Sequence, residues 1–75
     1  MKKIFVSDFD DRVTVDDITW LFRRYGPVLG ARMRKGKLRR YAIVTMPDAA
    51  ADRAIEALDG TKWRTTWLEV SESKW

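Results

Sequence analysis

The sequence contains no cysteine and no histidine. Without cysteine the chain forms no disulfide and offers no thiolate for catalysis or for zinc binding. Without histidine it lacks the commonest general base and the commonest transition-metal ligand. We therefore expect no catalytic residue, no metal site and no cofactor, and we expect the protein not to be an enzyme.

Long apolar runs are also missing. The apolar run 4–6 that follows the first lysines ends at Ser7, far short of the apolar region of a signal peptide. No segment approaches the ~20 apolar residues of a membrane span. We expect a cytoplasmic protein with no membrane contact. A chain of 75 residues is one small domain, 1–75, which buries about 60% of its unfolded surface, and we expect a monomer.

Charge is present but uneven. The chain has a net charge of +4 and a pI near 9.8. Residues 32–40 hold six cations and no acid, whereas Asp residues are frequent between 8 and 17. The six cations are Arg32, Arg34, Lys35, Lys37, Arg39 and Arg40. Such a run is either a solvated hairpin or a patch that faces phosphates.

Alternation and helical spacing indicate the order of elements in the first half of the chain. The stretch 3–7 alternates between apolar and other residues, which predicts a strand. Thr14 fits a helix N-cap, with Asp17 completing a shortened capping box, and the helical apolar spacing that follows runs to Tyr25. Gly26-Pro27 should end this helix. Strands 28–35 and 39–46 then follow, joined too tightly for anything but a hairpin.

The second half predicts one more helix and one more strand. Asp48 is the expected N-cap of a helix with a face of small apolar residues, which ends at Gly60. Leu68 and Val70 should point inward on the last strand, with Trp67 pointing outward. The sum is an α+β, ferredoxin-like β-α-β-β-α-β sandwich, with two helices on one face of a four-stranded antiparallel sheet. The outer face keeps four apolar or aromatic side chains that nothing covers: Phe5, Tyr41, Ile43 and Trp67.

With this order, the chain resembles the RNA recognition motif (RRM) family over roughly residues 3–71. The stretch 39–46, RRYAIVTM, is similar to the longer ribonucleoprotein motif of the family, K/R-G-F/Y-G/A-F-V-x-F/Y. It matches at Arg39, Tyr41, Ala42 and Val44, and departs at Arg40, Ile43 and Met46. The stretch 4–9, IFVSDF, is similar to the shorter motif, with Asp8 where asparagine is usual. The two helices, ITWLFRRYGPV and ADRAIEALDGTKW, also resemble those of the family.

The resemblance implies a non-catalytic module that binds single-stranded RNA, or single-stranded DNA, on the open sheet face. Phe5 and Tyr41 then hold the two principal stacking positions, and Ile43 replaces a third aromatic ring. Arginine contacts to phosphates, together with Lys3 on the side of Phe5, would complete the site. The RNA-binding residues implied are Phe5, Tyr41, Ile43, Arg32, Arg34, Arg39, Arg40, Lys3 and Trp67.

Two other functions remain open from the residues. The first is a protein-interaction module that uses Trp20 on the first helix, or a surface of Trp67 and Trp75, with Phe5 and Tyr41 as ordinary exposed aromatics or cover for the C-terminal tail. The second is a small phosphatase on the same scaffold, which needs a loop that cradles phosphate. The loop after the first strand, DFDDR, is acidic rather than glycine-rich, so the sequence speaks against this enzyme.

Overall fold

The chain folds as four antiparallel strands with two helices on one side. The structure is a computed structural model that describes residues 1–10, 12–37, 40–64 and 66–73. The elements in chain order are β1 (Lys2–Ser7), α1 (Val15–Phe22), the 3₁₀ turn η1 (Arg23–Tyr25), β2 (Gly30–Lys35), β3 (Arg40–Met46), α2 (Asp48–Leu58), β4 (Lys62–Trp63), β5 (Thr66–Trp67) and β6 (Glu69–Glu72). The main sheet has the order β2-β3-β1-β6, and β4 and β5 form a small separate ribbon. The predicted fold class is confirmed.

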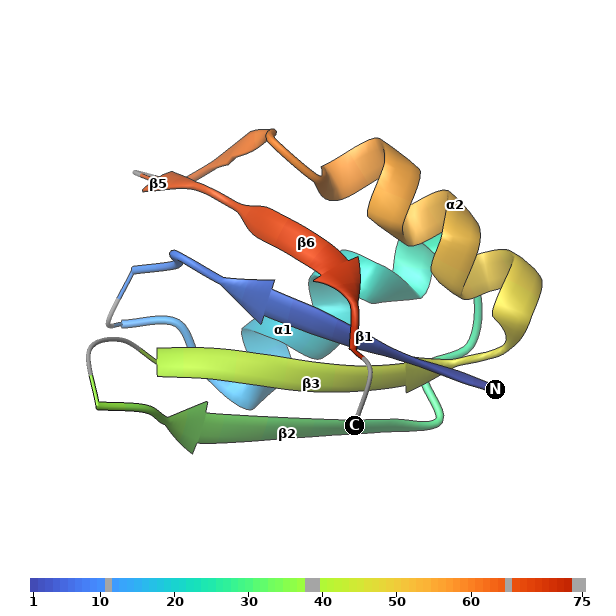
Figure 1. Cartoon of the computed structure of the whole chain (residues 1–75), viewed down its shortest axis with the longest axis horizontal. Coiled ribbons are helices and arrows are strands. Elements are labelled where there is room, and N and C mark those ends of the chain that lie inside the picture. The colour runs from blue at the N-terminus through green and yellow to red at the C-terminus, as the bar shows by residue number, and fades with distance from the viewer. Residues whose placement is uncertain (11, 38–39, 65, 74–75) are drawn as a thin grey trace.

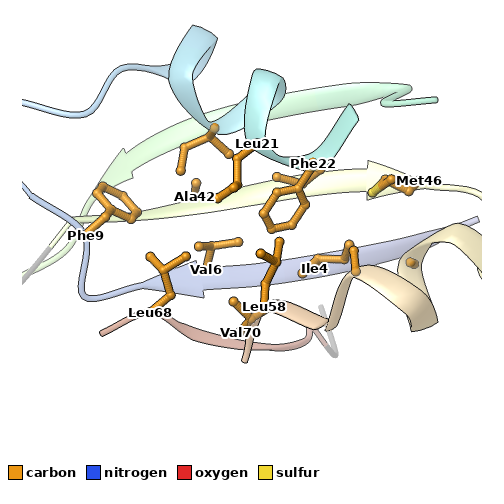
Figure 2. Packing of buried hydrophobic residues seen from close by; sticks show 14 of the residues in the cluster. Ile4, Val6, Phe9, Leu21, Phe22, Ala42, Met46, Leu58, Leu68 and Val70 are labelled. Carbon is orange, nitrogen blue, oxygen red and sulfur yellow. The ribbon is translucent and has the colours of Figure 1, made fainter. Parts of the chain in front are cut away.

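One face of the sheet packs on both helices. In Figure 1 the sheet lies in front and α1 is seen behind β1 and β3. Figure 2 shows Leu21 and Phe22 of α1 directed toward the strands, where Ile4 projects from β1. The buried core consists of Ile4, Val6, Phe9, Val13, Ile18, Leu21, Phe22, Ala42, Val44, Met46, Ala50, Ala51, Ala54, Leu58, Leu68 and Val70. The predicted inward residues of β1, β3 and the last strand are all among them.

Local signals explain where the helices begin and end. Thr14 is the N-cap of α1, and its hydroxyl accepts a hydrogen bond from the backbone N–H of Asp17 while the Asp17 carboxylate accepts one from the Thr14 N–H. The predicted capping box is therefore confirmed. Gly26 follows η1 with a φ of 152°, and a Cβ there would lie 2.5 Å from the Cβ of Ala50. Glycine thus lets the end of α1 approach α2 closely.

Three boundary predictions are wrong. The N-cap of α2 is Pro47, and Asp48 is the first helical residue, with no side-chain cap. The second strand begins at Gly30 rather than at residue 28. The last strand begins at Glu69, which pairs with Ser7, the last residue of β1. The next residue, Asp8, has a φ of 67° and turns the chain out of the sheet, so β1 offers no partner to the residues before Glu69. Trp67 lies on the separate β4–β5 ribbon and not on the last strand.

Candidate nucleic-acid interface

The open face is the side of the main sheet that the helices leave uncovered. Strand alternation places Phe5 of β1 and Tyr41 and Ile43 of β3 on this face, opposite the buried residues of the same strands. The register aligns Arg32, Ile43 and Phe5 in one row across β2, β3 and β1. The next row contains Arg34, Tyr41 and Ser7. The two predicted ring positions therefore lie at the centre of the sheet, with cations beside them.

Phe5 and Tyr41 are in contact with each other. Their ring centroids are 5.2 Å apart and their planes differ by 29°, which is a stacked arrangement. The contact is diagonal, because the residue directly opposite Phe5 is Ile43. Such a ring pair stabilises the fold by about 0.5–1.5 kcal/mol beyond its buried area. The two rings thus form one aromatic cluster at the centre of the open face.

Arg32 and Arg34 lie on the edge strand β2, and both are exposed. Lys3 is also exposed and lies opposite Thr45, on the side of Phe5. These three cations border the ring pair with side chains free to reach a phosphate. Arg39 lies outside the part of the chain that the structure describes.

Arg40 is placed differently from the other predicted arginines. It has the same alternation as Ala42, so its side chain belongs to the helix side of the sheet, and its Nη2 donates a hydrogen bond of 3.2 Å to the carbonyl oxygen of Val13. The structure therefore does not bring Arg40 to the open face with Tyr41. The same period-2 pattern that assigned Tyr41 to one side already put Arg40 on the other.

Trp67 is not brought to the ring pair either. It is 65% exposed and pairs across the β4–β5 ribbon with Lys62. The sequence interpretation extended the last strand two residues too far and so placed Trp67 beside Phe5. Trp75 lies outside the described residues.

A groove on the open face runs along β2 and β3, from Arg34 and Tyr41 to Gly30 and Thr45. Its volume is about 540 Å³. Its lining residues are Met1, Lys3, Leu29, Gly30, Ala31, Arg32, Arg34, Tyr41, Ile43 and Thr45. Tyr41 and Ile43 border it, whereas Phe5 is not among the lining residues. The lining residues that the sequence interpretation missed are Met1, Leu29, Gly30, Ala31 and Thr45. Alternation already set Thr45 on the side of Tyr41.

Ion pairs hold the start of β1 against the covered side. The Lys2 Nζ lies 2.8 Å from Asp52 Oδ1 on α2 and 3.3 Å from Glu72 Oε1 on β6. The hydrogen bond to Asp52, followed by that to Glu72, raises the pKa of Lys2 above its usual value. With Lys2 turned toward these acids, alternation directs Lys3 to the opposite side, where it lines the groove.

Ser7 is an unusual member of the open face. Its side chain is 1% exposed, and its Oγ has no hydrogen-bond partner among the described residues. It lies between Tyr41 and Glu69 in the strand register. The Ser7 hydroxyl therefore lies covered beside Tyr41 and is not presented to a ligand on the open face.

The described residues contain no group of three or more acidic, histidine or cysteine side chains arranged to hold a metal ion. None of the helices in this part of the chain has the length and apolar content to cross a membrane. The open face combines half-exposed rings, exposed guanidinium groups and a groove, which are the elements of a surface that binds single-stranded nucleic acid.

Comparisons with known proteins agree with this surface. The family model described as RNA recognition motif matches residues 4–68. RbpE of Nostoc sp., named as a candidate RNA-binding protein, is 36% identical over 95% of this chain and 77% of its own length. The crystal structure of RNA binding protein PG1 superposes with a TM-score of 0.89 at 30% identity, covering 99% of this chain and 95% of that one.

A structure that contains nucleic acid is also similar. The Sxl-lethal protein/RNA complex superposes with a TM-score of 0.85 at 27% identity, over 97% of this chain and 47% of that one. The family match covers most of the chain, and it includes both strands that carry the ring pair. The chain belongs to the RNA recognition motif family.

Proposed function

We propose that this chain is a non-catalytic module that binds single-stranded RNA on its open sheet face. The observation that carries the proposal is the stacked pair of Phe5 and Tyr41 at the centre of an uncovered sheet. Family membership and the RNA-binding names of its relatives support the same function. Bases would stack on the ring pair, and Arg32 and Arg34 would contact phosphates.

The expected affinity follows from these contacts. Each base stacked on an aromatic ring contributes ~1–3 kcal/mol, independent of base identity. Two stacked bases give about 2–6 kcal/mol before the cost of ordering the RNA. With a few phosphate contacts added, the dissociation constant is expected to be roughly micromolar or weaker. Sequence selectivity should be low, since Ile43 supplies no third ring.

Titration of short fluorescent RNAs of mixed sequence, at low salt, tests the stacking. Phe5→Ala and Tyr41→Ala should each weaken binding by about 5- to 150-fold, the equivalent of one lost stack. Trp20→Ala is the matched control, because it removes an aromatic ring that is 66% exposed on α1, away from the open face. Unchanged binding in both open-face variants would refute the stacking, and absence of binding by the unaltered protein would refute the function.

A salt series separates phosphate contacts from stacking. For single strands the logarithm of the binding constant falls with the logarithm of salt concentration at a slope of about −0.7 per phosphate neutralised. Arg32→Gln and Arg34→Gln should each make this slope shallower by about 0.7, whereas Tyr41→Ala should leave it unchanged. A DNA strand of matched sequence measures any preference that comes from the 2′-hydroxyl groups.

A second candidate function is a protein-interaction module. Trp20, with 66% of its surface exposed, is the observation that favours it, because tryptophan is enriched among the residues that anchor protein–protein interfaces. Trp20→Glu should spare RNA affinity and abolish partner binding in an affinity capture experiment. If the unaltered protein and Trp20→Glu capture the same partners, Trp20 has no role in a protein interface.

A further inference from the structure

The outer side of α1 is the side that faces away from the sheet. Trp20 is 66% exposed there. With 3.6 residues per turn, it lies almost opposite the buried stripe of the same helix, which consists of Ile18, Leu21 and Phe22. In Figure 1 α1 is seen behind the strands, on the side away from the open face. This surface is therefore separate from the one proposed to bind RNA.

Charged residues are placed symmetrically about Trp20. Two acids precede it by four and three residues, and two arginines follow it by three and four: Asp16, Asp17, Arg23 and Arg24. Positions seven residues apart are almost two helical turns apart and share one side of a helix. Asp16 therefore lies on the same side of the ring as Arg23. Asp17 and Arg24 lie on the other side, so the surface has a negative end, a central ring and a positive end.

Most of these charges are unpaired within the chain. Asp16, Arg23 and Arg24 are exposed, and they make no ion pair with any residue that the structure describes. Asp17 differs, because its carboxylate lies 3.2 Å from the Nη2 of Arg64. Asp16 and Arg23 are about 10 Å apart along the helix axis, too far to pair with each other. These two charges are thus available to another molecule.

A second copy of α1 complements this arrangement. When two such helices pack antiparallel about a two-fold axis at Trp20, Asp16 of each copy lies against Arg23 of the other, and the two rings meet at the centre. A parallel arrangement would bring Asp16 against Asp16 and align the helix dipoles, which is unfavourable. An interface that uses the same surface on both copies closes on itself, so assembly stops at two.

We propose that the outer side of α1 is a homodimer interface, in which Trp20 is the central anchor and Asp16 pairs with Arg23 of the second copy. This interface gives Trp20 a partner, and so rests on the protein-interaction function proposed for that residue rather than on RNA binding. The two open faces are directed away from each other in the dimer, and each stays free for RNA.

The dimer is expected to be weak. The helix α1 has only eight residues, about 12 Å of length, so the interface is smaller than those of stable complexes. We expect a dissociation constant of about 0.1–1 mM. At such concentrations the dimer replaces the monomer expected from the sequence.

Sedimentation equilibrium and NMR diffusion, at protein concentrations from about 0.05 to 2 mM without RNA, measure the association. The apparent mass should rise toward that of a dimer. Trp20→Glu should weaken the association at least about tenfold, because a central tryptophan carries a large share of the binding. Trp67→Glu is the matched control, with the same change at a tryptophan that is 65% exposed on the β4–β5 ribbon. A protein that stays monomeric throughout, or equal losses in both variants, would overturn the interface.

An exchange of charges tests the antiparallel geometry. Asp16→Arg places an arginine against Arg23 of the second copy, and Arg23→Glu places a glutamate against Asp16. Each variant alone should dimerise about tenfold more weakly, since the dimer contains the contact twice. In a mixture of the two variants every contact joins opposite charges, so a mixed dimer should form as well as the original one. This recovery would also show that both variants fold. A mixture no better than either variant alone would refute the pairing.

Failure of the dimer and failure of RNA binding are distinguishable. The association is measured without RNA, and at protein concentrations far below its dissociation constant Trp20→Glu should bind RNA as the original does. The backbone amides of Trp20 and Arg23 should shift with protein concentration, whereas those of Phe5 and Tyr41 should shift when RNA is added. Concentration-dependent shifts confined to Phe5 and Tyr41 would place self-association on the open face and contradict the interface on α1. A monomeric protein whose Trp20 captures a different protein would refute the homodimer and leave the protein-interaction function standing.

Discussion

Strands β1 and β3 each have one side chain row on the covered face and one on the open face, and the two rows differ in what they do. Ile4 and Val44 are fully buried against the helices, whereas their neighbours Phe5 and Ile43 are half-exposed. Burial on one side supplies the free energy that keeps the sheet folded. The side chains of the open face are not needed in the core, so they can be rings and charged groups that contact a ligand. Residues adjacent in the sequence thus serve stability and binding separately.

The strongest test of this separation is Ile4→Ala. Truncation of a buried isoleucine lowers the free energy of unfolding by about 2–5 kcal/mol, a large share of the roughly 5–15 kcal/mol that a domain possesses. Urea unfolding followed by circular dichroism measures the loss. Phe5→Ala, one residue away, should lower the free energy of unfolding by less than Ile4→Ala does, because the Phe5 ring is only half-buried and its contact with Tyr41 adds about 0.5–1.5 kcal/mol to its buried area. If both variants are equally destabilised, the open row also belongs to the core.

The sequence was sufficient for the fold because its signals are local and repeated. Period-2 alternation in β1 and β3, and the 3.6-residue spacing from Ile18 to Phe22, identify the buried faces directly. The capping box at Thr14 was visible as a three-residue spacing. These signals agree with one another, and hence the order of the elements along the chain and the open face were predicted correctly.

The sequence was less informative about the site, because the position of Trp67 and the shape of the groove depend on which residues of distant segments pair. The end of β1 at Ser7 decides that Trp67 does not pair with β1, and the φ of 67° at Asp8 carries no pattern of its own. The groove depends on Gly30 lying opposite Thr45, a matter of register. Arg40 was assigned to the site through its charge, although alternation placed it on the other face.

Two arginines provide the next comparison. Arg40 donates to the Val13 carbonyl on the covered side, so Arg40→Ala should lower the free energy of unfolding by about 1.5–3 kcal/mol, the range for a hydrogen bond that involves a charged group. The salt slope of RNA binding should not change. Arg34→Ala should do the reverse, with a shallower salt slope and almost unchanged stability. A shallower slope in Arg40→Ala would mean that its side chain reaches the RNA.

Phenylalanine at two adjacent positions of β3 sharpens the contrast further. Ile43→Phe restores a ring to the open face and should tighten RNA binding by about 1–2 kcal/mol, toward the lower end of the value of one stacked base. Val44→Phe places the same ring in a filled core and should destabilise the fold by about 1–3 kcal/mol through overpacking. Fluorescence titration and urea unfolding of both variants measure these effects. Unchanged affinity in Ile43→Phe would show that no base passes over position 43.

The contact between the two rings can be measured without RNA. Phe5→Leu, Tyr41→Leu and the double variant form a cycle of unfolding free energies. The coupling expected for a stacked pair is about 0.5–1.5 kcal/mol. A coupling of this size means that the aromatic surface is formed before RNA arrives, which lowers the ordering cost of binding. A coupling near zero would indicate rings that associate only in the complex.

The smallest expected effect is on the stability of the fold at low pH, and it arises on the covered side of the sheet. The Thr14 backbone N–H holds the pKa of Asp17 below its usual value, with a smaller contribution from Arg64, whose Nη2 lies 3.2 Å from the carboxylate. Because the folded state binds this proton less readily than the unfolded state, the stabilisation is present above pH ~4 and is lost as pH falls through the lowered pKa.

Asp17→Asn should therefore flatten the decline of the urea midpoint between about pH 5 and pH 3. It should not abolish the decline, because the N-terminal amine also lowers the pKa of Asp48. At neutral pH the variant should bind RNA as tightly as the original, since Asp17 caps α1 on the side away from the rings. A change in affinity at neutral pH would mean that the capping box also fixes the open face, and that the two faces of the sheet are coupled.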